Sequence, residues 1–286
     1  MFDERNNVEV RGDGGQGIYL YCLALRNALP PIEEPGLDER FPVFPLALDD
    51  IVAVVSHVGL AAWTGPASET HLKSLAWLAP RVCRHEKVIE QVMRHSAVLP
   101  ARFGTFFSSP AELGRLVQAN HDAILEFLLR VADKAECAVK GLLDKASAVE
   151  QLLARDPRAS TFPTSSGAGY LMKQRLRDEI RKELAFWTKT TGEAIVMELR
   201  RHAVDSRPLP VLSPEASGRD GEMVFNWAFL LARDGWKRFE AQVERLGTIF
   251  GDTGLILEIS GPWPAYSFCP SLQPAPSPTS AHFSRC

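Results

Sequence analysis

The chain lacks the cysteine and histidine patterns that mark metal sites and disulfide frameworks. Its five cysteines are widely spaced and odd in number, with no Cys-x-x-Cys pair, which is typical of reduced thiols inside a cell. Among its seven histidines, His85 and His95 fall near one expected helix without the i,i+4 spacing of a metal-binding pair. We therefore expect no metal and no cofactor.

Motifs for group transfer are also missing. The segment 165–171 (SSGAGYL) lacks the Gly-Lys-Ser/Thr end of a phosphate-binding loop, so it is better explained as the start of a helix. There is no GxSxG elbow, and no cysteine stands in a motif that would activate it. Glu258, inside the last expected strand, is more often an outward-facing carboxylate than a base. We expect no catalytic residues and no enzyme activity.

Neither charge nor hydropathy indicates a nucleic acid or a lipid membrane as a partner. The 32 Lys and Arg residues against 35 Asp and Glu give a net charge of −3, whereas a nucleic-acid-binding domain presents a dominant basic face. No run reaches the roughly 18 apolar residues that span a bilayer. The polar, acidic start of the chain does not resemble a signal peptide. We expect a soluble, cytoplasmic protein.

The composition favours two globular domains of mixed α and β structure. With 45% hydrophobic residues in 286, the chain is long enough for two cores. We expect a polar, glycine-rich arm at 1–17, an α+β domain at 18–133, a second domain at 134–268, and a Pro/Ser-rich tail at 269–286.

In the first domain, the apolar run 18–25 predicts a central strand covered on both faces, and runs at 41–48 and 51–58 predict two more. A helix is expected over 70–96, with an inward stripe that includes Leu72 and Leu75. The segment 97–107 is expected to be a broken edge strand, because Pro100 and Gly104 interrupt it. Ser109 to Glu112 then form a capping box that starts a helix reaching about residue 132.

Glu86 stands out because it falls on the apolar stripe of the helix expected over 70–96. A carboxylate buried alone is costly, so an ion pair is its expected partner. Arg102 alternates with apolar residues of the next strand and points inward in this interpretation. We therefore hypothesise a structural ion pair between Glu86 and Arg102.

The second domain has the pattern of a βαββαβ, ferredoxin-like fold. Its expected elements are a strand at 137–143, a weak helix, a long helix at 170–202, a short edge strand at 209–212, a strand at 223–232, a helix at 236–250 and a closing strand at 254–260. The long helix is charged on its outer faces, which is most simply a solvated surface.

The segment GPWPAYSF at 261–268 follows the closing strand, which is expected to stop at Pro262 because proline cannot donate to a ladder. The stiff backbone then presents Trp263, Tyr266 and Phe268. Two interpretations stay open. The three aromatic side chains either form a lid over the protein's own core or present a contact surface for a partner.

Several of these segments together resemble the gas vesicle protein F/L family of accessory proteins. They are YLYCLAL, VLPARFGTFF with the helix after it, VKG, GYLMKQR, NWAFLL and GPWPAYSF, and they cover about residues 18–268. The resemblance implies a two-domain α+β protein, the second domain a modified ferredoxin-like fold. It also implies a minor gas vesicle component, without catalytic residues, that binds the small hydrophobic shell protein and limits its aggregation during nucleation.

A soluble partner that covers the apolar face of a shell subunit needs an exposed sheet edge and aromatic anchors. The candidate partner-binding residues are therefore Phe103 and Phe107 on the edge segment, together with Trp263, Tyr266 and Phe268. Two alternatives remain. The chain is an interaction module that bridges other accessory proteins through its long charged helix, or it is an enzyme that holds a small ligand on the ferredoxin-like sheet.

Overall fold

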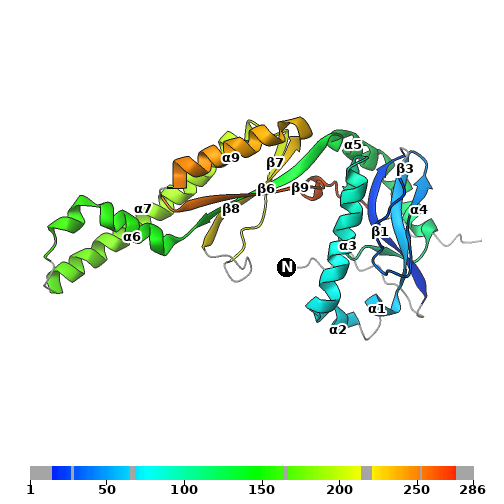
Figure 1. The fold of residues 1–286 in the computed structure, drawn as a ribbon, viewed down its shortest axis with the longest axis horizontal. Helices are drawn as coiled ribbons and strands as arrows, with labels where there is room; N and C mark the ends of the chain where they lie inside the picture. The colour runs from blue at the N-terminus through cyan, green and yellow to red at the C-terminus, as the bar shows by residue number, and fades with distance from the viewer. Residues whose placement is uncertain are drawn as a thin grey trace, which may run out of the picture. The chain divides into compact units, whose positions relative to one another are not determined.

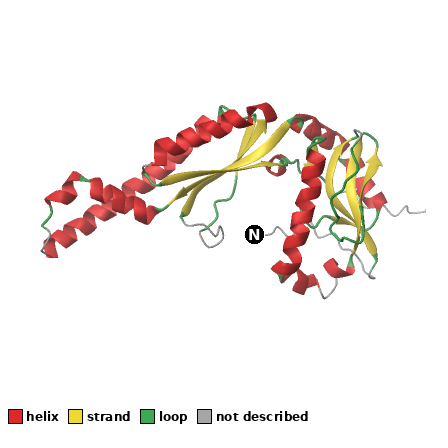
Figure 2. Cartoon of the chain, in the orientation of Figure 1, coloured by secondary structure: helices red, strands yellow, loops and turns green. Residues whose placement is uncertain are grey.

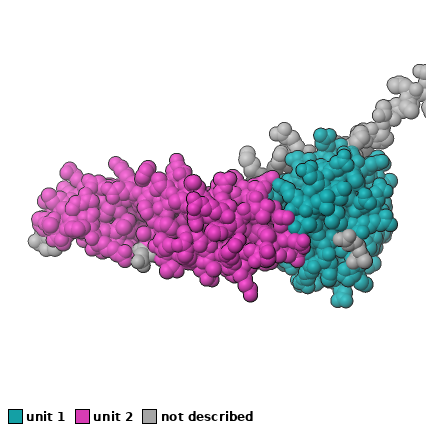
Figure 3. Space-filling view, turned by 90° about the horizontal axis from the view of Figure 1, so that it is seen from above, with its two compact units in different colours: residues 1–132, 264–286 teal, residues 133–263 magenta. Residues whose placement is uncertain are grey.

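A computed structural model describes residues 15–26, 29–64, 68–163, 167–213, 221–251 and 253–274 of the chain. The chain divides into two compact units, which Figure 3 colours separately. Unit 1 contains residues 1–132 and 264–286, and unit 2 contains residues 133–263. The segment after residue 263 therefore belongs with the first unit, whereas the sequence placed residues up to 268 in the second domain.

Unit 1 is built on a five-stranded sheet with the order β2-β3-β1-β4, in which β5 also pairs with β1. Its strands are β1 (Gln16–Leu25), β2 (Val43–Leu48), β3 (Ile51–Gly59), β4 (Val98–Pro100) and β5 (Phe106–Phe107). Every residue from Gly17 to Ala24 is buried, as expected for a strand that is covered on both faces. All the pairings of β1 are antiparallel.

Helices cover this sheet in unit 1 (Figures 1 and 2). They are α1 (Ala61–Thr64), α2 (Ser68–Lys73), α3 (Leu75–Met93), α4 (Pro110–Ala119) and α5 (His121–Val131). The helix expected over 70–96 is thus two helices that meet at Ser74, and the next expected helix is interrupted at Asn120. The cap at Ser109 is confirmed, because its side chain accepts a hydrogen bond from the backbone N–H of Glu112.

Unit 2 contains a four-stranded antiparallel sheet with the order β7-β8-β6-β9. Its elements are β6 (Lys134–Leu143), α6 (Lys145–Arg155), the 3-10 helix η2 (Pro157–Thr161), α7 (Gly167–Arg200), β7 (Asp205–Pro208), β8 (Glu222–Ala232), η3 (Arg233–Gly235), α9 (Trp236–Gly251) and β9 (Leu255–Trp263). The short edge strand is β7, at 205–208, whereas the sequence placed an edge strand at 209–212.

One face of this sheet packs against α7 and α9. Phe225 and Phe229 of β8 and Leu255 of β9 share a core with α7 and α9, including Ile195 and Phe239. The first turns of α7 pair instead with α6, and the two helices form a hairpin beyond the end of the sheet (Figure 2). The long helix therefore buries one stripe along its length while most of its other positions face solvent.

The last strand does not stop at Pro262, contrary to the expectation from the sequence. β9 runs to Trp263, which pairs with Glu136 after a bulge in the register. This is possible because β9 is an edge strand, so a proline without an N–H removes no bond from a second neighbour. Gly261 is required just before it, because its φ is +129° and a Cβ would lie 2.8 Å from the carbonyl oxygen of Glu136.

A buried histidine holds α3 against the sheet of unit 1. His85 is fully buried, and its Nε2 lies 3.1 Å from the carbonyl oxygen of Ala101, which can only accept. Nδ1 is therefore the acceptor, and it receives the hydroxyl of Tyr19 at 2.8 Å. The backbone N–H of Gly104 donates to the same Tyr19 oxygen at 3.4 Å. The neutral imidazole thus links α3, β1 and the turn at 101–104.

This histidine gives unit 1 a defined response to pH. Burial lowers the pKa of His85 from its ordinary value of 6.5 to about 4. Between pH 6.5 and 4 the unfolded chain therefore binds a proton that the folded chain does not, so this contribution to stability falls as the pH falls, by about 3 kcal/mol at pH 4. The measurement is the unfolding free energy of the wild type and of His85→Phe over this range. A wild-type curve no steeper than that of the variant would contradict this assignment.

Candidate interaction surface

Unit 1 contains a continuous cluster of aromatic rings that begins in the core and reaches the surface. Buried Tyr19 contacts Phe103 and Phe106, with ring centroids 6.4 and 5.1 Å apart. Trp63 of α1 contacts both of these phenylalanines at 5.8 and 4.9 Å. Trp63 in turn lies 4.7 Å from Trp77 of α3. Four elements far apart in the sequence therefore contribute to one surface.

The outer end of the aromatic cluster is capped by cationic and polar groups. The imidazole of His71 stacks on Trp77 with a centroid distance of 4.8 Å and an interplanar angle of 7°. The guanidinium of Arg81 lies 3.9 Å from the Trp77 ring centroid, in a cation–π contact, and it donates to the carbonyl oxygen of Trp77. Trp77 is thus held rigidly at the surface.

Two leucines beside this cluster point into solvent. Leu72 and Leu75 are 48% and 76% exposed, although their spacing predicted the buried stripe of one continuous helix. The extended backbone of Ser74 separates Leu72 in α2 from the stripe of α3. Leu75 is the first residue of α3, and the buried residues of this helix begin only at His85. We call Trp63, Leu72, Leu75 and Trp77 the aromatic end of unit 1; α1 and α2 lie together at one end of α3 in Figure 1.

Of the two phenylalanines expected from the sequence, Phe103 belongs to the ring cluster. Phe103 is half-buried within the ring cluster, and Phe107 of β5 is buried. β5 pairs with β1 on one side, and among the described residues no strand pairs with its other side. The sequence identified this edge but missed Trp63 and Trp77. Their signal in the sequence was two tryptophans on either side of Thr64-Gly65-Pro66, a sequence that disfavours a continuous helix.

The aromatic side chains of the C-terminal segment lie in different places. Phe268 is 1% exposed and packs within unit 1, which matches the interpretation as a lid on the protein's own core. Trp263 is 41% exposed on the last strand of unit 2. The structure therefore does not bring Trp263, Tyr266 and Phe268 together as one exposed group.

Tyr266 is the partner of Glu86, in place of the expected Arg102. The Tyr266 hydroxyl donates to Glu86 Oε1 at 3.0 Å. Burial raises the pKa of the Glu86 carboxyl, the Tyr266 hydrogen bond opposes this shift, and nearby Glu90 adds to it. Arg102 is exposed and forms no ion pair with Glu86 within the part of the chain that the structure describes. The partner of the Glu86 carboxylate is therefore the Tyr266 hydroxyl, and the ion pair with Arg102 expected from the sequence is not formed.

Asn120 fixes the end of the described C-terminal segment to unit 1. Its Nδ2 donates to the carbonyl oxygen of Gln273 at 2.9 Å, and its Oδ1 accepts from the Gln273 N–H at 2.8 Å. The side chain therefore pairs with the backbone as a neighbouring strand would. Arg130 adds a bond to the carbonyl oxygen of Phe268 at 2.9 Å. The predicted tail is docked as far as residue 274, and residues 275–286 lie outside the described part.

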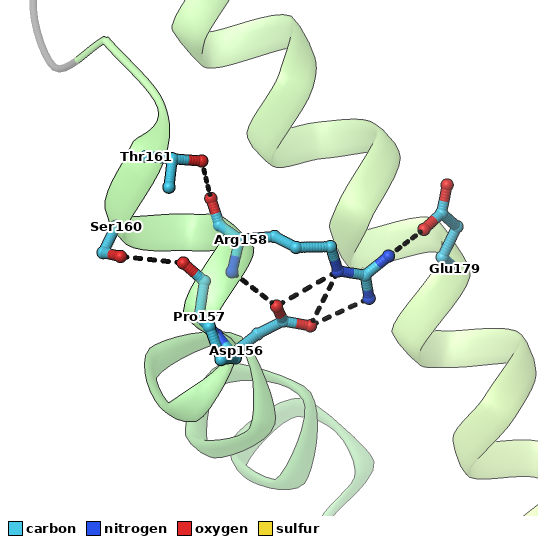
Figure 4. Close-up of polar contacts among 6 residues, drawn as sticks. All are labelled: Asp156, Pro157, Arg158, Ser160, Thr161 and Glu179. Atoms are coloured by element: carbon cyan, nitrogen blue, oxygen red, sulfur yellow. Dashed lines mark hydrogen bonds and ion pairs between the residues drawn. The ribbon is translucent and has the colours of Figure 1, made fainter.

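The helical hairpin of unit 2 is held together by ion pairs (Figure 4). The guanidinium of Arg158 in η2 binds Asp156 at 2.8 Å and reaches Glu179 of α7 at 3.0 Å. Arg177 of α7 binds Glu150 of α6 at 2.8 Å. Hydroxyls of Ser160 and Thr161 bond to the backbone carbonyls of Pro157 and Arg158. The hairpin is therefore connected by charged contacts as well as by its apolar stripe.

No group of three or more His, Cys, Asp or Glu side chains that could hold a metal ion occurs among the described residues. Over the same ranges, none of the helices has the length and the apolar character needed to cross a membrane.

The structure thus defines an α+β protein of two compact units whose most developed surface feature is an aromatic cluster. The family model described as "Gas vesicle synthesis protein GvpL/GvpF" matches residues 17–270. The chain belongs to this family, so its role is an accessory one connected with gas vesicles.

Individual relatives agree with this assignment. The chain is 26% identical over 286 aligned residues to gas vesicle protein L1 of Halobacterium salinarum, covering 94% of this chain and 96% of that protein. It is 27% identical over 221 residues to gas vesicle protein L of Streptomyces sp. (strain CB03234), covering 77% of this chain and 80% of the relative.

Two crystal structures share the fold. GvpF from Anabaena sp. PCC7120 superposes with a TM-score of 0.67 at 20% identity, covering 91% of this chain and 98% of that one. GvpF from Microcystis aeruginosa gives a TM-score of 0.60 at 19% identity, with 89% and 99% covered. The mixed helix and sheet architecture expected from the sequence is therefore that of known GvpF proteins.

We predict that Asn120→Ala loosens the C-terminal segment. The change removes both bonds to Gln273 and leaves two backbone groups without a partner, which costs about 1–3 kcal/mol locally. Amide hydrogen exchange over residues 266–273 should therefore accelerate about tenfold or more. Gln118→Ala, at an exposed position on the same stretch of helix, is the control. Equal exchange rates in the two variants would show that Asn120 does not hold the segment.

Proposed function

We propose that this chain binds the small hydrophobic shell protein of gas vesicles, limits its aggregation before or during nucleation, and is itself a minor vesicle component. The membership of the GvpL/GvpF family supports the gas vesicle context. The observation that carries the proposed binding is the aromatic end of unit 1, where exposed Leu72 and Leu75 lie beside the half-buried rings of Trp63 and Trp77.

The chemistry of this surface suits an apolar partner. A shell subunit that faces gas needs a strongly apolar face, and such a face aggregates in water. Rigid tryptophan rings and exposed leucines bury apolar area at a low cost in conformational entropy. Because Trp77 is already fixed by His71 and Arg81, little ordering is required on binding. The adjacent β5 edge offers backbone groups to an extended segment of the partner.

The proposed binding surface consists of other residues than the partner-binding residues predicted from the sequence. Phe103 contacts Trp63 from the inner side of the cluster, whereas Phe107 is buried in β5. Tyr266 and Phe268 act as a lid on the core of unit 1, and they do not belong to the proposed binding surface. Trp263 stays a separate candidate on unit 2.

The strand order β7-β8-β6-β9, with helices on one face, supports the classification of unit 2 as a modified ferredoxin-like fold. We assign to this fold a role in protein binding, with no enzymatic reaction and no cofactor. The protein acts in the cytoplasm and at the gas vesicle, through contacts with gas vesicle proteins.

The test is co-expression with the shell protein. We predict that the wild type keeps the shell protein in the soluble fraction and co-purifies with it. The triple variant L72S/L75S/W77A should lose most of the soluble shell protein, because it removes the two exposed leucines and the half-buried Trp77 ring. The measurement is the ratio of soluble to sedimented shell protein, together with the circular dichroism of the purified variant.

Leu129→Ser is the matched control, because Leu129 is an exposed leucine on α5 of the same unit, outside the aromatic end. It should leave the ratio unchanged. If the triple variant is folded and protects the shell protein as well as the wild type does, the aromatic end is not the binding surface.

A further inference from the structure

The outer side of α7 carries a row of exposed side chains that pack against nothing in unit 2. The row recurs at intervals of three, four and seven residues, so it lies on one side of the helix, away from the buried stripe. We call it the outer α7 face, and it consists of Leu171, Arg175, Lys182, Phe186 and Lys189. Leu171 and Phe186 are 62% and 72% exposed.

The acidic groups between residues 145 and 182 are already bound by arginines. Residues 145–182 contain eight Lys or Arg and four Asp or Glu, a net charge of +4 in a chain whose total is −3. All four carboxylates are bound by arginines of the same hairpin, and the pairs are Glu150 with Arg177, Asp156 and Glu179 with Arg158, and Asp178 with Arg181. Three arginines are neutralised in this way, so the excess positive charge lies on other residues.

Two of the remaining cations, Arg175 and Lys182, are on the outer α7 face, together with Lys189 further along the helix. Arg175, Lys182 and Lys189 are exposed and form no ion pair with any residue that the structure describes. Two acidic residues point to the same side, Asp178, which Arg181 binds at 2.9 Å, and Glu193, one turn beyond Lys189. From residue 171 to residue 189 the face is about 27 Å long, at a rise of about 1.5 Å per residue.

We propose that the outer α7 face is a docking surface for an acidic amphipathic helix of a partner protein. Leu171 and Phe186 are apolar anchors about 22 Å apart, and the three cations lie between and beside them. A partner helix with the same spacing places its carboxylates opposite Arg175, Lys182 and Lys189 and its apolar side chains against the anchors. This surface lies on unit 2, so it is separate from the aromatic end of unit 1 and does not depend on the proposed shell binding.

Other occupants fit these features less well. A second copy of the chain that used the same face would set cations opposite cations, which is unfavourable. An anionic membrane favours a helix with a broad apolar side, whereas this face has two isolated apolar residues with cations between them. A nucleic acid would use the cations and gain little from Leu171. An acidic helix is the occupant that uses all five side chains.

The experiment uses the full-length protein and a synthetic 20-residue helical peptide with leucines on one side and glutamates flanking them. Binding is followed by fluorescence anisotropy of the labelled peptide. We expect affinity at least about tenfold above that for the counterpart with glutamine at the same positions, and a decrease with rising salt. K182E/K189E should lose about tenfold or more in affinity, and Phe186→Ser should also weaken binding.

K237E/R238E is the matched control, because it makes the same change in charge at exposed positions of α9 in the same unit. It should bind the acidic peptide like the wild type. The proposal is overturned if the glutamate and glutamine peptides bind equally, or if K182E/K189E binds no more weakly than K237E/R238E. It is also overturned if anionic vesicles or an oligonucleotide bind through Lys182 and Lys189 while the acidic peptide does not. If K182E/K189E loses peptide binding but protects the shell protein as well as the wild type does, the two surfaces act independently.

Discussion

The arrangement of unit 1 depends on one buried imidazole. His85 accepts from Tyr19 and donates to the carbonyl oxygen of Ala101, so it connects α3, the central strand and the turn after β4. That turn carries Phe103 and leads to Phe106, the two rings on which Trp63 rests. Because a buried polar group without partners is costly, these bonds specify one position for the turn. The position of Trp63 therefore depends on the bonds of His85.

Local patterns in the sequence predicted the elements well where a short stretch determines them. Ser109 accepts from the Glu112 N–H as expected, and the apolar run that starts at Ile18 is a strand buried on both faces. Errors arose where the tertiary context decides. Pro262 is tolerated inside β9 because this strand is at an edge. Leu72 and Leu75 are exposed although their spacing fits a buried stripe, because the helix breaks at Ser74 and the buried part of α3 begins only at His85.

Hydrogen bonds between residues far apart in the chain could not be predicted from the sequence. The carboxylate of Glu86 required a partner, and Arg102 was predicted because it alternates with apolar residues of the next expected strand. The actual donor is Tyr266, 180 positions away. The same limit applies to Asn120 and Gln273, whose pairing assigns the C-terminal segment to unit 1. Trp63 and Trp77 were missed because only the fold brings α1 and α3 together.

Two surfaces of different chemistry thus lie on separate units, an aromatic one on unit 1 and a basic one on α7, as suits an accessory protein that meets more than one partner. We propose that the aromatic end of unit 1 contacts the shell protein. The most direct test places a photo-crosslinking amino acid at position 75 or at position 129 and analyses the products formed with the shell protein. We expect a crosslink from position 75 and none from position 129. A crosslink from position 129 alone would show that the shell protein binds elsewhere.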